Sequence, residues 1–298
     1  MNHKIACFIL CHGRPNTCKT WHSLEKHGYT GQKYVVCDNL DATLPGYQEI
    51  FGDSVKVFDK AYGISLSDSG DNFDNHNVSM YPRNVIRDWA KEMDLDYYFV
   101  LDDDYSYYRY NVTHNFEIVR TAKTIKNLDR VFDAMVEYMH NTPQLDCLAM
   151  GQTGEMIGGV TADSVGPKRK VMNLFLFSTQ RDYEFMGKLN EDVNMYVHGG
   201  WRGKLYLTTR QVMLQQNATQ QGGGITDVYR TMGTYVKSFY SLLYQPSSVK
   251  VAMMSTKHSR LHHEIDWRHT VPKILNPKYS RISDRKTESD TWEKDPES

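Results

Sequence analysis

The first hundred residues contain four short apolar runs; three of them lack polar alternation, and the third is a short strand-like segment interrupted by Lys56. The runs span residues 4–10, 33–38, 55–58 and 97–101. Such runs are typical of strands that are buried on both faces, as in a parallel sheet. Helical spacing separates them: one segment follows Thr17, and a clearer one carries an apolar stripe from Val85 to Met93. This alternation predicts a Rossmann-like beginning to an α/β domain, and the missing glycine fingerprint argues against a dinucleotide ligand.

The rest of the chain predicts further elements of the same two kinds. A helix is expected over residues 128–139, and strands are expected over 145–150, 171–177 and 249–254. Another helix is expected to start near Asp192 and to break at Gly199 and Gly200, and a last one to run from Thr226 to Leu243. Polar loops lie between these elements, at residues 63–79, 151–170 and 215–224. From residue 281 onward the chain is charged and poor in apolar residues, which predicts a flexible tail over 281–298.

Composition limits the possible partners. The chain has 298 residues and a formal net charge of −1. This near-neutral balance creates no general attraction to nucleic acid, so such a partner would need a local basic patch. No apolar run approaches the length of a membrane span, and the first residues enter a strand-like run rather than a signal peptide. The five cysteines match no common zinc spacing, so we expect reduced thiols in a cytoplasmic protein with no membrane partner.

Three consecutive aspartates follow the fourth apolar run. They lie at the expected carboxyl end of a strand, where ligands of open α/β sheets bind. Side chains alternate sides on an extended segment, so Asp102 and Asp104 should project together while Asp103 faces away. Two such carboxylates suit a hard cation, Mg or Mn, that also binds phosphate oxygens. The alternative is a solvated acidic turn without a ligand.

Other polar residues are expected at the same sheet edge. The turn that contains Gly13 and Arg14 follows the first strand and can approach a phosphate or a nucleobase closely. Asp38 ends the second strand, where a carboxylate can accept hydrogen bonds from a ribose. Arg83 lies in the first turn of the helix before the aspartates, where a guanidinium suits a pyrophosphate.

Taken in order, these residues and the run into the aspartates resemble the nucleotide-sugar half of a GT-A fold glycosyltransferase. The resemblance implies one GT-A domain over residues 1–280, with a nucleotide-sugar half (1–105) and an acceptor half (106–280) around one mixed sheet. It also implies that Asp102 and Asp104 hold Mn or Mg beside the sugar diphosphate. Five residues would bind the nucleotide-sugar, most simply a UDP-sugar: Arg14, Asp38, Arg83, Asp102 and Asp103.

The resemblance extends to two later segments. An acidic pair at this stage of GT-A enzymes supplies the general base, and Asp192 resembles that base, with Glu191 beside it. The role presumes an inverting transfer, in which a carboxylate takes the proton of the acceptor hydroxyl. The alternative is that the pair only favours a helix N-terminus electrostatically. GT-A enzymes also bring a late histidine to the metal, so His263 and His262 are implied as ligands, with His258 as the competitor.

Two segments are similar to the TET-associated glycosyltransferases of bacteriophages: residues 101–105, and residues 262–267 followed by 272–275. This resemblance implies a hydroxymethylated pyrimidine in phage DNA as the acceptor, first 5-hydroxymethylcytosine, in the cytoplasm of an infected bacterial cell. Six residues would then contact DNA: Lys168, Arg169, Lys170, Tyr107, Arg260 and Arg268. The alternatives are a saccharide, lipid-carrier or small-molecule acceptor, or a metal-dependent nucleotidyltransferase or phosphoesterase, because these enzymes also use clustered aspartates and histidines.

Overall fold

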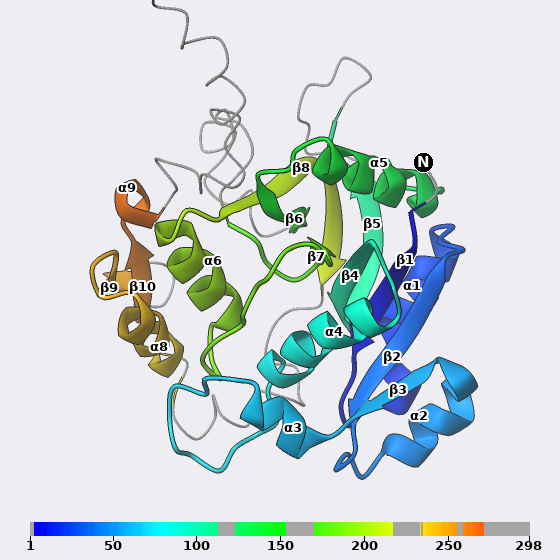
Figure 1. The fold of residues 1–298 in the computed structure, drawn as a ribbon, viewed down its shortest axis with the longest axis horizontal. Coiled ribbons are helices and arrows are strands. Elements are labelled where there is room, and N and C mark those ends of the chain that lie inside the picture. The colour runs from blue at the N-terminus through cyan, green and yellow to red at the C-terminus, as the bar shows by residue number, and fades with distance from the viewer. Residues whose placement is uncertain are drawn as a thin grey trace, which may run out of the picture.

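One mixed sheet of eight strands forms the centre of the molecule, in the order β3-β2-β1-β4-β7-β6-β8-β5 (Figure 1). The structure is a computed structural model that describes residues 3–112, 123–152, 170–216, 233, 235–254 and 259–270. The strands of this sheet are β1 (Ile5–Leu10), β2 (Gln32–Asp38), β3 (Val55–Phe58), β4 (Tyr97–Asp102), β5 (Tyr105–Tyr110), β6 (Leu145–Gln152), β7 (Phe175–Ser178) and β8 (Leu205–Gln216).

The first four strands form the parallel half of the sheet. β1 pairs in parallel with β2 on one side and with β4 on the other, and β2 pairs in parallel with β3. Leu10 lies opposite Asp102, so β1 and β4 end at the same level. The polar turns that follow β1, β2 and β4 therefore meet at one edge of the sheet, as the sequence predicted.

Helices cover both faces of the sheet. Alternate side chains of β4 serve different cores: Phe99 packs with residues of α1 and α5, whereas Tyr98 and Val100 pack with residues of α4 and α6. Phe99 stacks on Phe132 of α5 with 4.1 Å between ring centroids. The helices are α1 (Lys19–Lys26), α2 (Leu44–Phe51), α3 (Lys60–Ser65), α4 (Met80–Glu92), α5 (Leu128–His140), α6 (Glu191–Trp201), α8 (Val236–Tyr244) and α9 (Trp267–Thr270).

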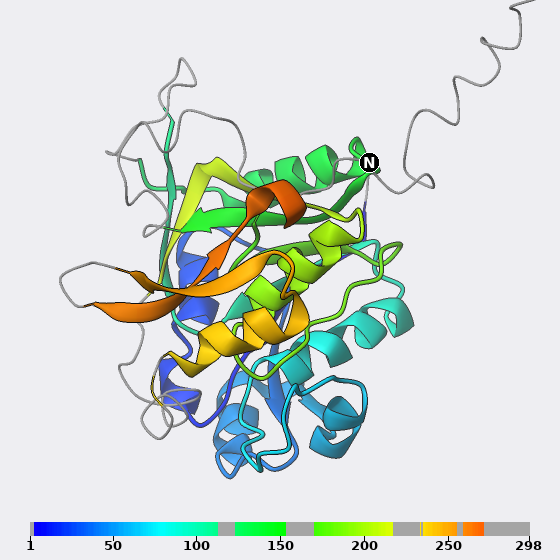
Figure 2. The ribbon, with the colours of Figure 1, turned by 90° about the vertical axis from the view of Figure 1, so that its left-hand side faces the viewer.

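A second, two-stranded sheet lies outside the main one. β9 (Val249–Met254) and β10 (Arg260–Ile265) pair antiparallel, and Figure 2 shows this hairpin and α8 lying over α6. Trp267 of α9 stacks on Tyr196 of α6, with centroids 5.9 Å apart and ring planes 10° apart. The late histidine-containing segment is thereby held against the helix that begins with the acidic pair.

The structure corrects one prediction about a helix end. Gly199 and Gly200 do not break α6, which continues to Trp201. A Cβ on Gly199 would overlap the hydroxyl of Tyr206, and one on Gly200 would overlap the backbone carbonyl of Thr270. The two glycines therefore allow close packing of neighbouring segments rather than a turn.

Other elements also differ from those expected from the sequence, two strands among them. The strand expected over residues 171–177 is shorter, since β7 begins at Phe175. β8 had no predicted counterpart because Thr208 and Arg210 interrupt its apolar pattern, although both residues are buried. The hydroxyl of Thr208 donates a hydrogen bond to the carbonyl of Lys170, which satisfies that polar side chain inside the sheet.

Several predicted features lie outside the described residues. They are most of the loops at 151–170 and 215–224, the beginning of the helix expected at Thr226, and the tail over 281–298. Within the described ranges, no helix is both long enough and apolar enough to cross a membrane.

Candidate active site

The turn that carries the three aspartates is fixed to the start of α1. The hydroxyl of Thr20 donates to the carbonyl of Asp102 (2.5 Å) and accepts from the backbone N–H of Tyr105 (2.9 Å). The backbone N–H of Thr20 donates to the carbonyl of Asp103 (3.1 Å). One buried threonine therefore sets the path of the chain between β4 and β5, so the carboxylates start from a rigid backbone.

The three carboxylates have three different environments. Asp102 accepts a hydrogen bond from Arg83 (Nη2–Oδ1 2.8 Å), and Asp103 forms a two-point pair with Arg14 (Nη2–Oδ1 2.6 Å, Nε–Oδ2 3.1 Å). Oδ1 of Asp104 is buried and has no hydrogen-bond partner within the described part of the chain. Burial, together with the charges of its neighbours Asp102 and Asp103, raises the pKa of Asp104 to about 7. The site thus holds one carboxylate oxygen with unmet bonding capacity.

Arg83 connects the aspartates to the beginning of α6. Its guanidinium is buried and contacts both Asp102 and Glu191, at 2.8 and 2.6 Å. Ser79 occupies the N-cap position of α4, but its hydroxyl donates to the carboxylate of Glu191 instead of capping the helix. The sequence predicted Arg83 to suit a pyrophosphate; the structure shows it paired with carboxylates at the end of β4 and the start of α6.

Asp192 lies beside this ion pair. Burial and the neighbouring charge of Glu191 raise the pKa of Asp192 to about 6, because both disfavour a second negative charge. One oxygen of Asp192 accepts the backbone N–H of Val193 at 2.8 Å. The acidic pair therefore differs from two solvated helix-start residues: Glu191 is neutralised by Arg83, whereas Asp192 keeps a carboxylate poised near neutral pH.

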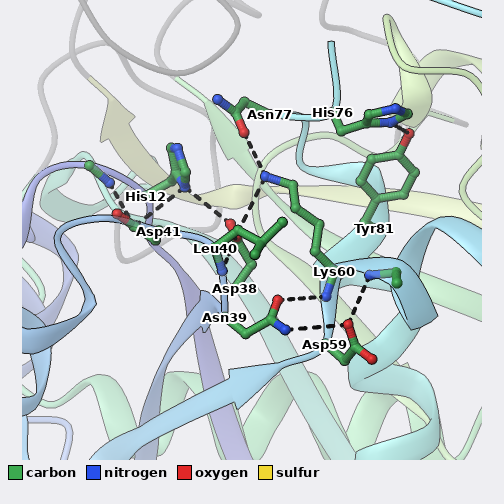
Figure 3. Close-up of polar contacts among 12 residues, drawn as sticks. His12, Asp38, Asn39, Leu40, Asp41, Asp59, Lys60, His76, Asn77 and Tyr81 are labelled. Atoms are coloured by element: carbon green, nitrogen blue, oxygen red, sulfur yellow. Dashed lines mark hydrogen bonds and ion pairs between the residues drawn. The ribbon is translucent and has the colours of Figure 1, made fainter. Parts of the chain in front are cut away.

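A polar network holds Asp38 at the end of β2 (Figure 3). His12 Nδ1 lies 3.1 Å from Asp38 and 3.3 Å from Asp41. The buried amine of Lys60 lies 3.4 Å from Asp38 and donates to Asn77 at 2.6 Å. Burial alone would raise the pKa of Asp38, but the hydrogen bond with His12 and the charge of Lys60 outweigh it and lower that pKa.

Neither His12 nor Lys60 was assigned a role from the sequence. Lys60 is in the first turn of α3, inside a stretch where no helix was expected. One signal in the sequence could have identified Lys60: it follows the end of β3 by two residues, and β3 ends beside β2, where Phe58 lies opposite Asp38. A cation just after that strand can reach the carboxylate that ends the neighbouring strand.

The late histidines lie near cationic side chains. His263 Nδ1 contacts the side-chain amide of Asn190 at 3.1 Å, and the rings of His262 and His263 are 4.2 Å apart. Burial, the neighbouring His262 and the charge of Lys237 lower the pKa of His263 to about 3. His263 is therefore neutral, the form in which an imidazole can bind a metal. His258 lies outside the described residues.

Of the six residues expected at DNA, two lie outside the described residues: Lys168 and Arg169. The charges of Lys170 and Arg260 help to lower the pKa values of His263 and His262, respectively. Lys237, which was not predicted from the sequence, lowers both. The remaining two lie elsewhere and have their own partners. Tyr107 packs edge-on against His27 (5.1 Å between centroids) and bonds Thr124, and the exposed Arg268 pairs with Asp266 at 3.0 Å.

The donor atoms of the aspartate turn suit a hard divalent cation. They are carboxylate oxygens, which Mn²⁺ and Mg²⁺ prefer, and Oδ1 of Asp104 is buried without a partner. Within the described ranges, no three His, Cys, Asp or Glu side chains are gathered into a set that could hold a metal. The aspartate turn thus fits a cation that takes its remaining ligands from phosphate oxygens and water, as Mg²⁺ usually does.

Comparison with known proteins gives one family and distant structural neighbours. The model of the family TET-Associated Glycosyltransferase matches residues 5–224, which confirms the resemblance, and with the mixed sheet it confirms the GT-A fold. Glucosyl-3-phosphoglycerate synthase from Mycobacterium tuberculosis, in complex with Mn²⁺, UDP-glucose and phosphoglyceric acid, is similar at 9% identity and TM-score 0.47, covering 87% of this chain and 86% of that one. GalNAc-T7 with UDP, GalNAc and Mn²⁺ is similar at 12% identity and TM-score 0.43, covering 72% and 44%. No curated protein matches the chain.

Proposed function

Because the chain belongs to the TET-associated glycosyltransferase family, we propose that it moves a sugar from a UDP-sugar to a hydroxymethyl group on a pyrimidine of DNA. The first candidate acceptor is 5-hydroxymethylcytosine, and the proposed setting is the cytoplasm of a phage-infected bacterium. Membership of a glycosyltransferase family removes the nucleotidyltransferase and phosphoesterase alternatives. The metal, the donor and the acceptor are the proposed parts of this function.

The observation that carries the proposal is the Arg83 bridge. It joins Asp102, at the end of β4, to Glu191, at the start of α6. A transfer reaction needs a leaving-group site and an acceptor-activating group a few ångströms apart, because the reacting atoms must be aligned. The buried guanidinium supports this arrangement by holding carboxylates from the two halves of the domain together.

Asp102 and Asp104 are the proposed metal ligands. The unpartnered Oδ1 of Asp104 is the group that fits this role, and the carboxylate of Asp102 lies beside it in the same turn. A bound Mn²⁺ or Mg²⁺ would offset the charge that develops on the leaving diphosphate. His263 and His262 remain proposed as later ligands; the contact with Asn190 engages Nδ1 of His263, so Nε2 would be its ligating nitrogen.

Asp192 is the proposed general base. It would accept the proton of the acceptor hydroxyl as that oxygen attacks the anomeric carbon and the bond to the diphosphate breaks. Its pKa of about 6 leaves it ionised at neutral pH yet basic enough to take a proton. Glu191 would keep this carboxylate in place through Arg83. The assignment presumes inversion at the anomeric carbon.

The nucleotide would lie over the ends of β1 and β2. Asp38 is ionised and oriented by His12 and Lys60, so it can accept hydrogen bonds from the ribose or from a base N–H. Arg14 is held by Asp103 at the rim of the same edge and is partly exposed, with a relative side-chain exposure of 39%. We propose that Asp38 and the Arg14–Asp103 pair together form the binding surface for the UDP portion of the donor.

DNA binding would depend on a local cation group. Lys170, Lys237 and Arg260 act together on the late histidines, next to the proposed base. Phosphate contacts of this kind supply affinity even when the net charge of the protein is near zero. Lys168 and Arg169 directly precede Lys170 in the sequence and would extend the group. Tyr107, which bonds Thr124, and Arg268, which pairs with Asp266, are kept as further candidates.

A saccharide or small-molecule acceptor is the second candidate, and one experiment separates it from DNA. Purified protein is incubated with Mn²⁺ or Mg²⁺, a panel of UDP-sugars and duplex DNA that contains hydroxymethylcytosine, and the nucleosides are analysed by mass spectrometry. A sugar mass increment that disappears in Asp104→Asn, and persists in the exposed control Asp53→Asn, supports the proposal. Release of UDP without DNA modification would overturn the DNA acceptor, and no release with any donor would overturn the donor.

A further inference from the structure

A row of side-chain amides ends at the carboxylate of Asp104. Asn173 donates to the carbonyl oxygen of Gln152 (Nδ2–Oε1 2.5 Å), and Gln152 donates to that of Gln216 (Nε2–Oε1 2.6 Å). The side chain of Gln216 is in turn hydrogen-bonded to Asp104. These amides come from the ends of β6 and β8 and from the segment before β7, and the mechanism above uses none of them.

The sheet register explains why the row ends at the aspartate turn. Gln216 is the last residue of β8 and lies opposite Tyr105, the residue that follows Asp104. Gln152 is the last residue of β6 and lies opposite Leu214 of β8. The ends of three strands therefore bring the two glutamines and the aspartate to one edge, and all three side chains are partly buried there.

The hydrogen bonds in this row all run in the same direction, from Asn173 toward Asp104. Asn173 donates to the carbonyl of Gln152, which leaves the NH₂ group of Gln152 facing Gln216. That NH₂ group fixes the carbonyl of Gln216 in the same way, so the NH₂ group of Gln216 faces Asp104. An amide has both a donor and an acceptor end, and a carboxylate accepts only. If Gln152 lost its amide, Gln216 could rotate and present its oxygen to the carboxylate.

We propose that Gln216, Gln152 and Asn173 form a positioning chain that orients the carboxylate of Asp104 toward the divalent cation. Gln216 holds the carboxylate, while Oδ1 is buried and has no partner within the described part of the chain. Partners of metal ligands generally fix the ligand's orientation in this way. The inference rests on the metal site of the proposed function and adds three residues to it.

Asn173 offers a clean way to remove one member. Its φ of 65° lies in the left-handed region, which glycine adopts without the cost of a Cβ. Asn173→Gly therefore keeps the backbone path and removes the whole side chain, including the amide that bonds Gln152. Its effect on Mn²⁺ affinity tests the positioning chain even if a glutamine variant fails to fold.

The test is titration of the purified protein with Mn²⁺ alone, followed by electron paramagnetic resonance, so that no sugar donor or turnover is involved. Gln216→Leu should weaken Mn²⁺ affinity by about 10- to 100-fold, the usual effect of losing a partner of a metal ligand. Gln152→Leu should weaken it in the same direction, because Gln152 fixes the amide of Gln216. The double variant should bind no worse than Gln216→Leu, because Gln152 acts only through Gln216.

The control is Gln215→Leu, which makes the same substitution one residue earlier, at an exposed position of β8. It should leave Mn²⁺ affinity unchanged. Unchanged affinity in Gln216→Leu, or losses that add in the double variant, would overturn the positioning chain while the proposed function stands. Failure of the unsubstituted protein to bind Mn²⁺ would overturn both. Thermal unfolding of each variant, with Asn173→Gly as the second probe, separates a loss of affinity from a loss of fold.

Discussion

Arg83 and Glu191 are 108 residues apart in the chain, yet Nη1 of the guanidinium lies 2.6 Å from Oε1 of the carboxylate. The same guanidinium contacts Asp102 at 2.8 Å. It also lies over the rings of Phe175 and Phe185, about 5 Å from each centroid. A buried cation shared by two carboxylates makes the aspartate turn and the acidic pair of α6 one electrostatic unit.

Arg83→Met should destabilise the protein strongly. Removal of one member of a buried ion pair leaves the other charges uncompensated and typically costs about 3–5 kcal/mol. The measurement is urea unfolding followed by circular dichroism. Lys91→Met breaks the exposed Lys91–Asp182 pair (3.0 Å) and should cost at most about 1 kcal/mol. Similar losses in the two variants would show that the Arg83 bridge contributes no more than a surface pair.

Activity should fall at low pH because Asp192 becomes protonated. Its pKa is raised to about 6, and the protonated carboxyl can no longer accept the acceptor proton. Below that pH, kcat/KM should drop by about tenfold for each pH unit. The residual activity of Asp192→Asn should lack this acid limb, whereas the exposed control Asp182→Asn should keep it. An acid limb that persists in Asp192→Asn would assign the titration to another group.

His12 should stabilise the protein more at low pH than at high pH. Its pKa is raised, first by the hydrogen bond with Asp38, so the folded state favours the protonated ring. The stabilisation is fully present below the ordinary pKa of 6.5 and is lost as the pH rises through the raised value. His12→Gln should therefore cost up to about 1 kcal/mol at low pH and less at high pH. Unfolding at pH 5.5 and pH 8.5, and an NMR titration of His12, check this; a difference that does not change with pH would contradict it.

Gly200→Ala should destabilise α6 through its contact with α9. The added Cβ would overlap the backbone carbonyl of Thr270, which cannot move without shifting α9. Overpacking of this kind costs about 1–3 kcal/mol. Gly199→Ala should cost less, because its Cβ would meet the end of the Tyr206 side chain rather than backbone. Thermal unfolding compares the two, and a larger loss in Gly199→Ala would show that the backbone contact is the more adaptable one.

Much of the sheet could be predicted from local pattern. The strands β1 and β4, and the second half of β2, are uninterrupted apolar runs because both of their faces are buried, whereas the edge strand β3 is short, contains Lys56 and is only partly buried. Their polar ends placed Asp38 and Asp102–Asp104 at one edge, since parallel strands share a direction. β8 could not be predicted in this way, because it carries buried polar residues whose partners come from distant segments.

The partners of the site residues could not be predicted in this way. The chain order suggested Arg83 for a phosphate, and the tertiary structure pairs it with Glu191 and Asp102. Gly199 and Gly200 looked like a helix break, yet packing against Tyr206 and Thr270 requires them within a helix.

The sequence by itself determined the family, the strand ends and the acidic residues at the sheet edge, because these depend on short-range periodicity and residue type. Only the tertiary structure decided which charges neutralise one another, which carboxylate keeps an unpartnered oxygen, and which amides reach it. Strand alternation in the sequence separates Asp103 from Asp102 and Asp104, but the partners of the three carboxylates, Arg83, Arg14 and Gln216, come from three other segments. Long-range packing brings those groups within hydrogen-bond distance, and no local pattern records it.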